Sequence, residues 1–179
     1  MGIWRTTFLP LEQFKRDEII PTEIDTVFRY QLIHGYVHDP AAAMMGGVGG
    51  HAGIFSSAQS LSVIMQLYLN GGTYGGKRYL TKETINHFTK QAFPGTENRR
   101  GFIFDKPGAF GEQSPAAKSA STLAFGHSGF TGTCAWADPS NGFIFIFLSN
   151  RVYPSAENNN LAKRNIRTEI MELFYKAMQ

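Results

Sequence analysis

Three β-rich runs with short connections occupy most of the last third of the chain, and they constrain its fold more than any other feature. They span residues 123–130, 133–138 and 143–149. Residues 138–142, Asp-Pro-Ser-Asn-Gly, supply turn chemistry between the second and third runs. Because sequential strands joined by short turns run antiparallel, the sequence predicts a three-strand antiparallel meander.

The third run, Phe-Ile-Phe-Ile-Phe-Leu-Ser, has almost no polar alternation. A strand that is apolar on both faces is normally covered on both sides. A meander of three strands would leave this one at an edge, where an apolar strand pairs with other chains. We therefore expect further strands of the sheet to come from residues preceding this chain or from a second copy, as an edge-strand homo-oligomer.

Helical patterns flank these strands. After Pro154, apolar residues recur at helical spacing and predict an amphipathic helix from about Ala156 to Met178 that covers one face of the sheet. Earlier in the chain, Ser56 with Gln59 forms a capping box for a helix that ends at Asn70. A second, shorter helix is expected from Thr81 to a point before Pro94.

The remaining segments are rich in Gly and Pro. Residues 1–45 are predicted to form extended segments and loops around a short apolar stretch at Val27–Ile33, and residues 46–53 form a tight glycine loop. Residues 93–122 are expected to make a long surface excursion with a short strand at 101–104. The fold class is α+β in one domain, residues 1–179, with a helical and loop region at 1–122 and the sheet and C-terminal helix at 123–179.

Composition excludes several classes of protein. The chain is 42% hydrophobic and 17% charged, as expected for a globular domain with a core. Its formal net charge of +3 comes from scattered Lys and Arg without a basic face, so a nucleic-acid partner is not expected. No apolar stretch reaches 18 residues, so we expect no membrane span.

Two motifs are weak signals for a ligand. Gly47–Ala52 fits the G-x-G-x-x-A dinucleotide pattern, but no convincing strand precedes it, which favours a structural loop or an active-site wall. His34 and His38 would share a metal only on a continuous helix, and Gly35 and Pro40 argue against one. We therefore expect neither a metal nor another cofactor.

The first β-rich run carries Gly126-His127-Ser128-Gly129-Phe130. This segment nearly matches the G-x-S-x-G nucleophile elbow, but Phe130 replaces the last glycine and a strand follows where the elbow needs a helix. The tripeptide 127–129 fits better as the K-T-G type of strand motif, which combines a polar head, a hydroxyl and a glycine that lets substrate approach. The segment is therefore interpreted as a wall of an active site.

Two long segments carry a resemblance to a known family. "GGVGGHAGIFSSAQSLSVIMQLYLNGG" and "FGHSGFTGTCAWADPSNGFIFIFLSNRVYP" resemble the C-terminal portion of β-lactamase-related serine hydrolases, the class C-like and penicillin-binding group. The chain is particularly similar to the module fused behind family 3 β-N-acetylhexosaminidases in Bacteroidetes. The resemblance implies a five-stranded antiparallel sheet between terminal helices and a helical subdomain. It also implies that the first strand, which pairs with the last, is not in this chain, so the fold is incomplete.

The resemblance also implies roles for four residues. His127 would be the polar head that orients a substrate carboxylate or assists proton transfer, and Ser128 would hydrogen-bond the substrate. Gly129 would admit it, and the N–H of Phe130 would be one oxyanion-hole donor. The implied substrate is a small molecule or cell-wall peptide, and the implied partner is the upstream part of the same protein, with a glycosidase domain as one candidate. A periplasmic or cell-envelope location is implied as well.

The nucleophile is missing from the sequence. No lysine has a serine three residues before it, so the chain contains no S-x-x-K, and Tyr68-Leu69-Asn70 is interpreted as a helix end and not as the family's Y-x-N motif. The chain alone is therefore expected to be catalytically inactive. Two alternatives stay open: a non-catalytic binding or docking module associated with a cell-wall glycosidase, and a structural domain in which His127 is a satisfied buried histidine.

Overall fold

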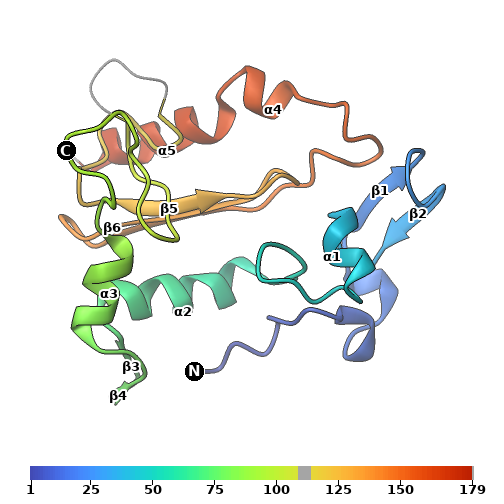
Figure 1. Ribbon diagram of the computed structural model, residues 1–179, viewed down its shortest axis with the longest axis horizontal. Coiled ribbons are helices and arrows are strands. Elements are labelled where there is room, and N and C mark those ends of the chain that lie inside the picture. Colours follow the sequence, from blue (N-terminus) through green and yellow to red (C-terminus); the bar gives the residue numbers. More distant parts are fainter. Residues whose placement is uncertain (109–113, 179) are drawn as a thin grey trace.

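The computed structural model describes residues 1–108 and 114–178 (Figure 1). Its main sheet has three antiparallel strands, β5 (Phe125–Ser128), β6 (Cys134–Asp138) and β7 (Phe143–Phe147), in the order β5-β6-β7. The predicted meander is confirmed. Strand β5 is shorter than expected because Leu123 leaves the ladder: its N–H donates to Ser121 Oγ at 3.1 Å and its carbonyl accepts from Lys106 Nζ at 3.0 Å.

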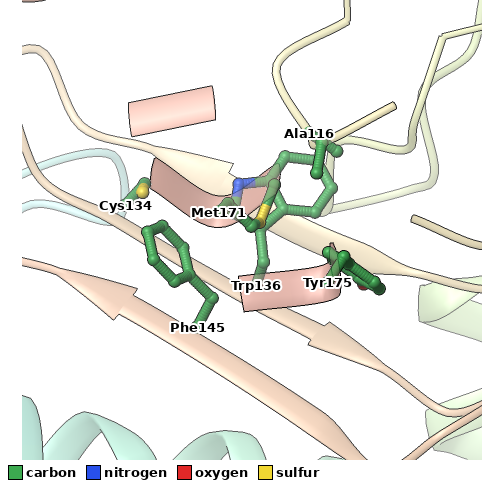
Figure 2. Packing of buried hydrophobic residues seen from close by; sticks show 7 residues of the cluster. Ala116, Cys134, Trp136, Phe145, Met171 and Tyr175 are labelled. Atoms are coloured by element: carbon green, nitrogen blue, oxygen red, sulfur yellow. The ribbon is translucent and has the colours of Figure 1, made fainter. Parts of the chain in front are cut away.

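Two helices cover the two faces of this sheet, α5 (Ile166–Ala177) on one side and α2 (Ala58–Leu69) on the other (Figure 1). The face toward α5 holds the larger hydrophobic cluster, in which side chains of β6 and β7 pack against two residues of the helix (Figure 2). Its labelled members are Ala116, Cys134, Trp136, Phe145, Met171 and Tyr175. On the face toward α2, Met65 packs with Phe125 and Ala137.

Strand β7 is covered on both faces, as its composition predicts. Phe143 stacks edge-on against Tyr175 of α5 with ring centroids 4.9 Å apart, and Phe145 packs in the same cluster. Ile144 points the other way, toward the cluster under α2. Among the strands at 1–108 and 114–178, only β6 pairs with β7, so its outer edge is open.

The C-terminal helix is shorter than predicted. It begins at Ile166 and not near Ala156, because Asn165 adopts a left-handed conformation with φ of 50° that an α-helix does not contain. A separate short helix, α4 (Asn160–Lys163), precedes it. The apolar spacing that predicted the helix therefore applies only to its last twelve residues.

The two earlier helices lie close to where the sequence places them. Helix α2 ends at Asn70 as predicted, but its N-cap is Ser57, whose Oγ accepts from the Ser60 N–H. The predicted cap, Ser56, instead shares a hydrogen bond with Thr6 Oγ1 at 2.9 Å. Helix α3 (Lys82–Thr89) follows the expected N-cap Thr81, and a small hairpin of β3 (Thr73–Tyr74) and β4 (Lys77–Arg78) separates the two helices.

The N-terminal region contains more regular structure than expected. Strands β1 (Pro21–Asp25) and β2 (Gln31–His34) form an antiparallel hairpin, followed by helix α1 (Pro40–Met44). Two 3-10 turns, Pro10–Glu12 and Arg16–Glu18, come before it. The predicted extended segments are confirmed as β1 and β2, and the apolar stretch at Val27–Ile33 spans their hairpin turn.

Hydrogen bonds attach this hairpin to the loop that follows β7. Asn150 Nδ2 donates to the carbonyls of Thr22, at 3.1 Å, and of Pro21. The Ile24 N–H donates to the Pro154 carbonyl at 2.9 Å. The hairpin is therefore held beside the end of the sheet where β7 finishes (Figure 1).

The segment before β5 contains no strand at 101–104, contrary to expectation. Isolated pairings hold it: Gln91 with Gly101, and Asp105 with Gly126 of β5. Residues 109–113 of the expected surface excursion lie outside the described residues. Across the part of the chain that the structure describes, no helix is long and apolar enough to span a bilayer.

Candidate functional site

The predicted motif lies at the C-terminal end of β5, and the strand's alternation separates its side chains. His127 pairs with Ala135, which packs against the cluster under α2, whereas Ser128 pairs with Cys134 of the cluster under α5. Facing partners in an antiparallel pair point to the same side of the sheet. The side chains of His127 and Ser128 therefore point to opposite faces of the sheet.

His127 is exposed and hydrogen-bonded at both ring nitrogens, so it is not a buried structural histidine. Arg100 Nη1 lies 3.2 Å from Nε2, and Nδ1 lies 2.9 Å from the Ser128 carbonyl. A guanidinium only donates hydrogen bonds, so Nε2 is the acceptor and Nδ1 carries the proton. In this arrangement Arg100 places a positive charge at the strand end.

The carboxylate of Asp105, next to β5, lies close to two arginine side chains. Asp105 is buried and fixed to β5 by two backbone hydrogen bonds with Gly126, at 2.7 and 3.1 Å. Its Oδ1 lies 3.4 Å from Arg99 Nη2 and 3.4 Å from Arg100 Nε. These are charge pairs without hydrogen-bond geometry, and among the described residues Arg99 Nε and Asp105 Oδ1 have no hydrogen-bond partner.

A polar cleft of about 380 Å³ opens on the Ser128 side of the strand. Arg99 and Arg167 contribute guanidinium groups to its wall, and no acidic side chain lines it among the described residues. Its other polar groups come from Ser114, Ser128, Asn165 and Thr168. Arg167 is held by a 3.0 Å hydrogen bond from Nη1 to the Thr133 carbonyl. Two cations and several neutral hydrogen-bonding groups without a carboxylate suit an anionic group on a ligand.

Gly129 and Phe130 follow the strand in a tight turn. The Gly129 N–H donates to the Thr133 carbonyl at 2.8 Å, and a Cβ at Gly129 would lie 2.4 Å from Thr133 Oγ1. A larger residue at this position would therefore displace the Thr133 hydroxyl. Phe130 is 63% exposed, and none of the described residues accepts a hydrogen bond from its N–H.

The other histidines singled out by sequence have local partners. His34 Nε2 donates to the Ile19 carbonyl at 2.6 Å, and no helix joins it to His38. His38 Nε2 lies 2.8 Å from Glu23 Oε2, and His51 Nε2 lies 2.9 Å from Asp39 Oδ1. Within residues 1–108 and 114–178, no three His, Cys, Asp or Glu side chains are placed to hold a metal ion.

Two further candidates have structural roles. Asn70 is the C-cap of α2 and Tyr68 packs against Phe104 and Phe125, which confirms that this Y-x-N is a helix end. Burial raises the pKa of the Cys134 thiol to about 11, although the nearby Arg167 opposes the shift, so the thiol stays protonated at neutral pH. Cys134 is therefore a small core residue and not a nucleophile.

Sequence reasoning placed Ser128 at a site but missed the arginines. Arg99 and Arg100 lie in the segment interpreted as a surface excursion, and Arg167 lies in the C-terminal helix. Only the pairing of Asp105 with Gly126 and the placement of α5 over the sheet bring them to the strand end. No local pattern contains that information.

The structure is an α+β domain: an antiparallel sheet lies between helices, and a serine and two arginines line a cleft at the end of its first strand. The chain belongs to the beta-lactamase family, whose model matches residues 3–168.

Relatives in that family carry the name "Putative D-alanyl-D-alanine carboxypeptidase". One from Escherichia coli K12 is 35% identical over 167 residues, which cover 84% of this chain and 37% of the relative. One from Salmonella typhi is 33% identical over 171 residues, covering 88% and 39%. The chain thus spans little more than a third of the length of the curated relatives it matches.

Proposed function

We propose that this chain is an incomplete single domain that forms the C-terminal part of the catalytic domain of a serine hydrolase. The hydrolase works through an acyl-enzyme and cleaves a cell-wall peptide, amide or ester. Family membership and the name of the relatives support the class of reaction. The short span of the match supports a longer polypeptide that supplies the nucleophile and its general base.

The cleft beside Ser128 is the observation that carries this proposal. A carboxypeptidase cuts next to a terminal carboxylate, and a carboxylate is best held by guanidinium and hydroxyl donors. Arg99, Ser128 and Arg167 present those donors in one cleft. We assign the substrate carboxylate to this cleft.

The remaining residues of the motif have distinct roles in this mechanism. The nucleophilic serine adds to the substrate carbonyl carbon, and the Phe130 N–H donates to the carbonyl oxygen as it becomes negative, an interaction worth about 10²–10³ in rate. The serine proton passes to the general base. The bond to the leaving amine or alcohol then breaks, that group takes the proton from the base, and water hydrolyses the acyl-enzyme. His127 orients Arg100, and Gly129 keeps the turn close to the strand.

The open edge of β7 gives the preceding residues a place in the sheet. An apolar strand with both faces covered and one edge free is stabilised by an additional strand. We assign that place to the upstream part of the same polypeptide. A second copy of the chain is the alternative occupant when the upstream part is absent.

Substitution of Arg99 tests the assignment of the cleft. In the longer polypeptide, Arg99→Gln should lower kcat/KM about 10- to 100-fold for a peptide ending in a free carboxylate, the cost of a charged hydrogen bond. The same peptide ending in a carboxamide should lose less than about threefold, because no carboxylate is present to pair. Arg78→Gln, at the far end of the molecule, is the matched control. Equal losses for the two peptides would refute the assignment.

A non-catalytic binding or docking module, next to a cell-wall glycosidase, is the second candidate. An S-x-x-K in the sequence upstream of these residues would favour the hydrolase, and its absence there would favour the binding module. The two functions differ in one property: the hydrolase reacts covalently with a penicillin once the preceding residues are present, whereas the binding module holds cell-wall peptides reversibly and is never acylated.

A further inference from the structure

We propose that Arg151 is a positioning residue for the Phe130 N–H, and that it acts through a closed ring of contacts that includes Glu23 and His38. The inference rests on the proposed role of Phe130 as an oxyanion donor. Arg151 lies just after β7 and outside the cleft described above. It therefore has no assigned contact with substrate and would act through the turn alone.

Arg151 holds the Phe130 turn at three points. Its guanidinium carbon lies 4.4 Å from the centroid of the Phe130 ring, within the range of a cation–π contact. Its Nε donates to the Phe130 carbonyl at 2.9 Å, and its backbone N–H donates to the Thr131 carbonyl at 2.9 Å. One residue thus fixes the side chain and two successive carbonyls of the turn.

His38 contacts the same phenylalanine from the N-terminal region. The His38 and Phe130 ring centroids are 5.1 Å apart with an interplanar angle of 33°. Because most of the Phe130 side chain is exposed, burial in a core does not fix it. Among the described residues, Arg151 and His38 both contact its ring.

Glu23 closes the ring between these two groups. Its Oε2 lies 2.8 Å from His38 Nε2, and its Oε1 accepts from the Ala156 N–H at 3.1 Å. The Ala156 carbonyl in turn accepts from Arg151 Nη1 at 2.9 Å. The contacts therefore run from Phe130 through Arg151, Ala156, Glu23 and His38 back to Phe130.

The turn needs this support because glycines flank Phe130. Gly132 has φ of +113°, a conformation that residues with a side chain rarely adopt, and Gly129 adds no side chain that would pack against the turn. Within the turn, the Gly132 N–H donates to the Gly129 carbonyl at 3.1 Å. An oxyanion donor must be held to within about 0.5 Å of its productive position, and a glycine-flanked turn does not hold it alone.

Arg151→Lys separates positioning from folding. Lysine keeps the positive charge but has no planar fork that reaches the Phe130 and Ala156 carbonyls together. The matched control is Arg78→Lys, because Arg78 Nη1 also joins two carbonyls, those of Gly71 at 3.0 Å and Leu80 at 2.9 Å, in the β4 hairpin. Similar melting temperatures for the two variants are expected.

In the longer polypeptide, Arg151→Lys should lower kcat for an ester substrate about tenfold or more and change KM less than about twofold, because a displaced donor weakens only transition-state stabilisation. Arg78→Lys should change neither by more than about twofold. A kcat for Arg151→Lys equal to that of Arg78→Lys would overturn the proposal.

A second measurement on this chain alone needs no activity. Arg151→Lys should accelerate amide hydrogen exchange at Gly132 about tenfold, since the turn opens more often, and Arg78→Lys should leave it unchanged. Unchanged exchange at Gly132 in Arg151→Lys would overturn the ring of contacts even if the longer polypeptide were active. An inactive longer polypeptide with accelerated exchange would refute the proposed function and keep the ring.

Discussion

The burial of large apolar side chains differs between two regions of the molecule. One is the sheet with its two helices, and the other is the N-terminal region of residues 1–57. The two tryptophans of the chain show the difference: Trp136 of β6 is 3% exposed, and Trp4 is 82% exposed. The sheet region buries its large side chains on both faces. In the N-terminal region several large side chains face outward, and they include Ile20, Val27, Tyr30 and Met44.

The sheet region is therefore stabilised by contacts within the chain, whereas the N-terminal region exposes apolar side chains that another polypeptide segment can cover. Large exposed apolar surfaces are typically covered by other protein. The relatives are far longer than this chain, so the proposed occupant is the upstream part of the same polypeptide.

The two tryptophans provide the sharpest comparison. Trp136→Ala should lower the free energy of unfolding by about 3–5 kcal/mol, because it removes a side chain from a filled core. Trp4→Ala should change it by less than about 0.5 kcal/mol, the usual limit for an exposed position. Urea unfolding followed by circular dichroism measures both. Equal losses would show that the N-terminal region carries as much of the stability as the sheet.

Asp138 tests the polar part of the sheet region. Burial favours a raised pKa, but hydrogen bonds from Ser121, Ser140 and Tyr175 outweigh it and hold the pKa below its usual value. Asp138→Asn should cost about 1–3 kcal/mol at neutral pH, because it leaves buried donors unpaired. Asp17→Asn, on the surface of the N-terminal region, is the control.

The stability loss in Asp138→Asn should depend on pH, because the pKa of Asp138 is lowered in the folded chain. A carboxylate with a depressed folded pKa stabilises the fold above its unfolded pKa, and the contribution disappears as pH falls through the folded value. The difference between Asp138→Asn and the unsubstituted chain should therefore shrink below about pH 4, the usual value for an aspartate. A constant difference from pH 7 to pH 2 would contradict the assignment.

Lys106 predicts a smaller effect at alkaline pH. Its ammonium group is buried and donates to the carbonyls of Thr89 at 2.9 Å and Leu123 at 3.0 Å. Desolvation lowers its pKa to about 8, against a weaker opposing effect of Asp138. The unfolded chain then binds more protons between about pH 8 and 10.5, so this lysine makes stability rise with pH in that window.

Comparison with Lys106→Met isolates this contribution. Between pH 8 and 10.5, the free energy of unfolding of the unsubstituted chain should rise by about 1–2 kcal/mol relative to the variant. Each unit of pKa difference is worth about 1.4 kcal/mol, and relaxation of the folded chain around the ammonium group reduces the total below that limit. Chemical unfolding at several pH values measures the two slopes. Parallel slopes would show that Lys106 does not titrate in this window.

The open edge of β7 predicts the smallest change in stability. Leu148 follows β7 and is 40% exposed, so Leu148→Lys should alter the free energy of unfolding by less than about 0.5 kcal/mol. A charge there should oppose strand pairing between copies and lower the apparent mass of concentrated samples in light scattering. An identical mass for both proteins would place the association elsewhere.

The sequence predicted the parts of the fold that are determined locally. The turn at 138–142 and the strands beside it depend on their own residues, and they were predicted within two residues. The break at Asn165 was not predicted because the apolar residues that indicated the helix all lie after it, from Ile166 onward. Their spacing does not show where the helix begins. The hairpin of β1 and β2 was not predicted as such because most of its apolar residues, Ile33 excepted, are exposed, so its apolar pattern does not report burial.

The candidate site was predicted only where a motif marks it. Ser128, Gly129 and Phe130 lie together because they are consecutive. Arg99 and Arg167 reach the same strand end through tertiary pairing, which no sequence spacing encodes. The tautomer of His127 likewise depends on Arg100, which the sequence places 27 positions away.

Covalent labelling by a fluorescent penicillin tests the central claim most directly. The account predicts that this chain alone gains no label, and that the polypeptide extended upstream through an S-x-x-K segment gains one label per molecule, measured by intact-protein mass spectrometry. Labelling of the isolated 179 residues, or an extended polypeptide that stays unlabelled, would contradict it.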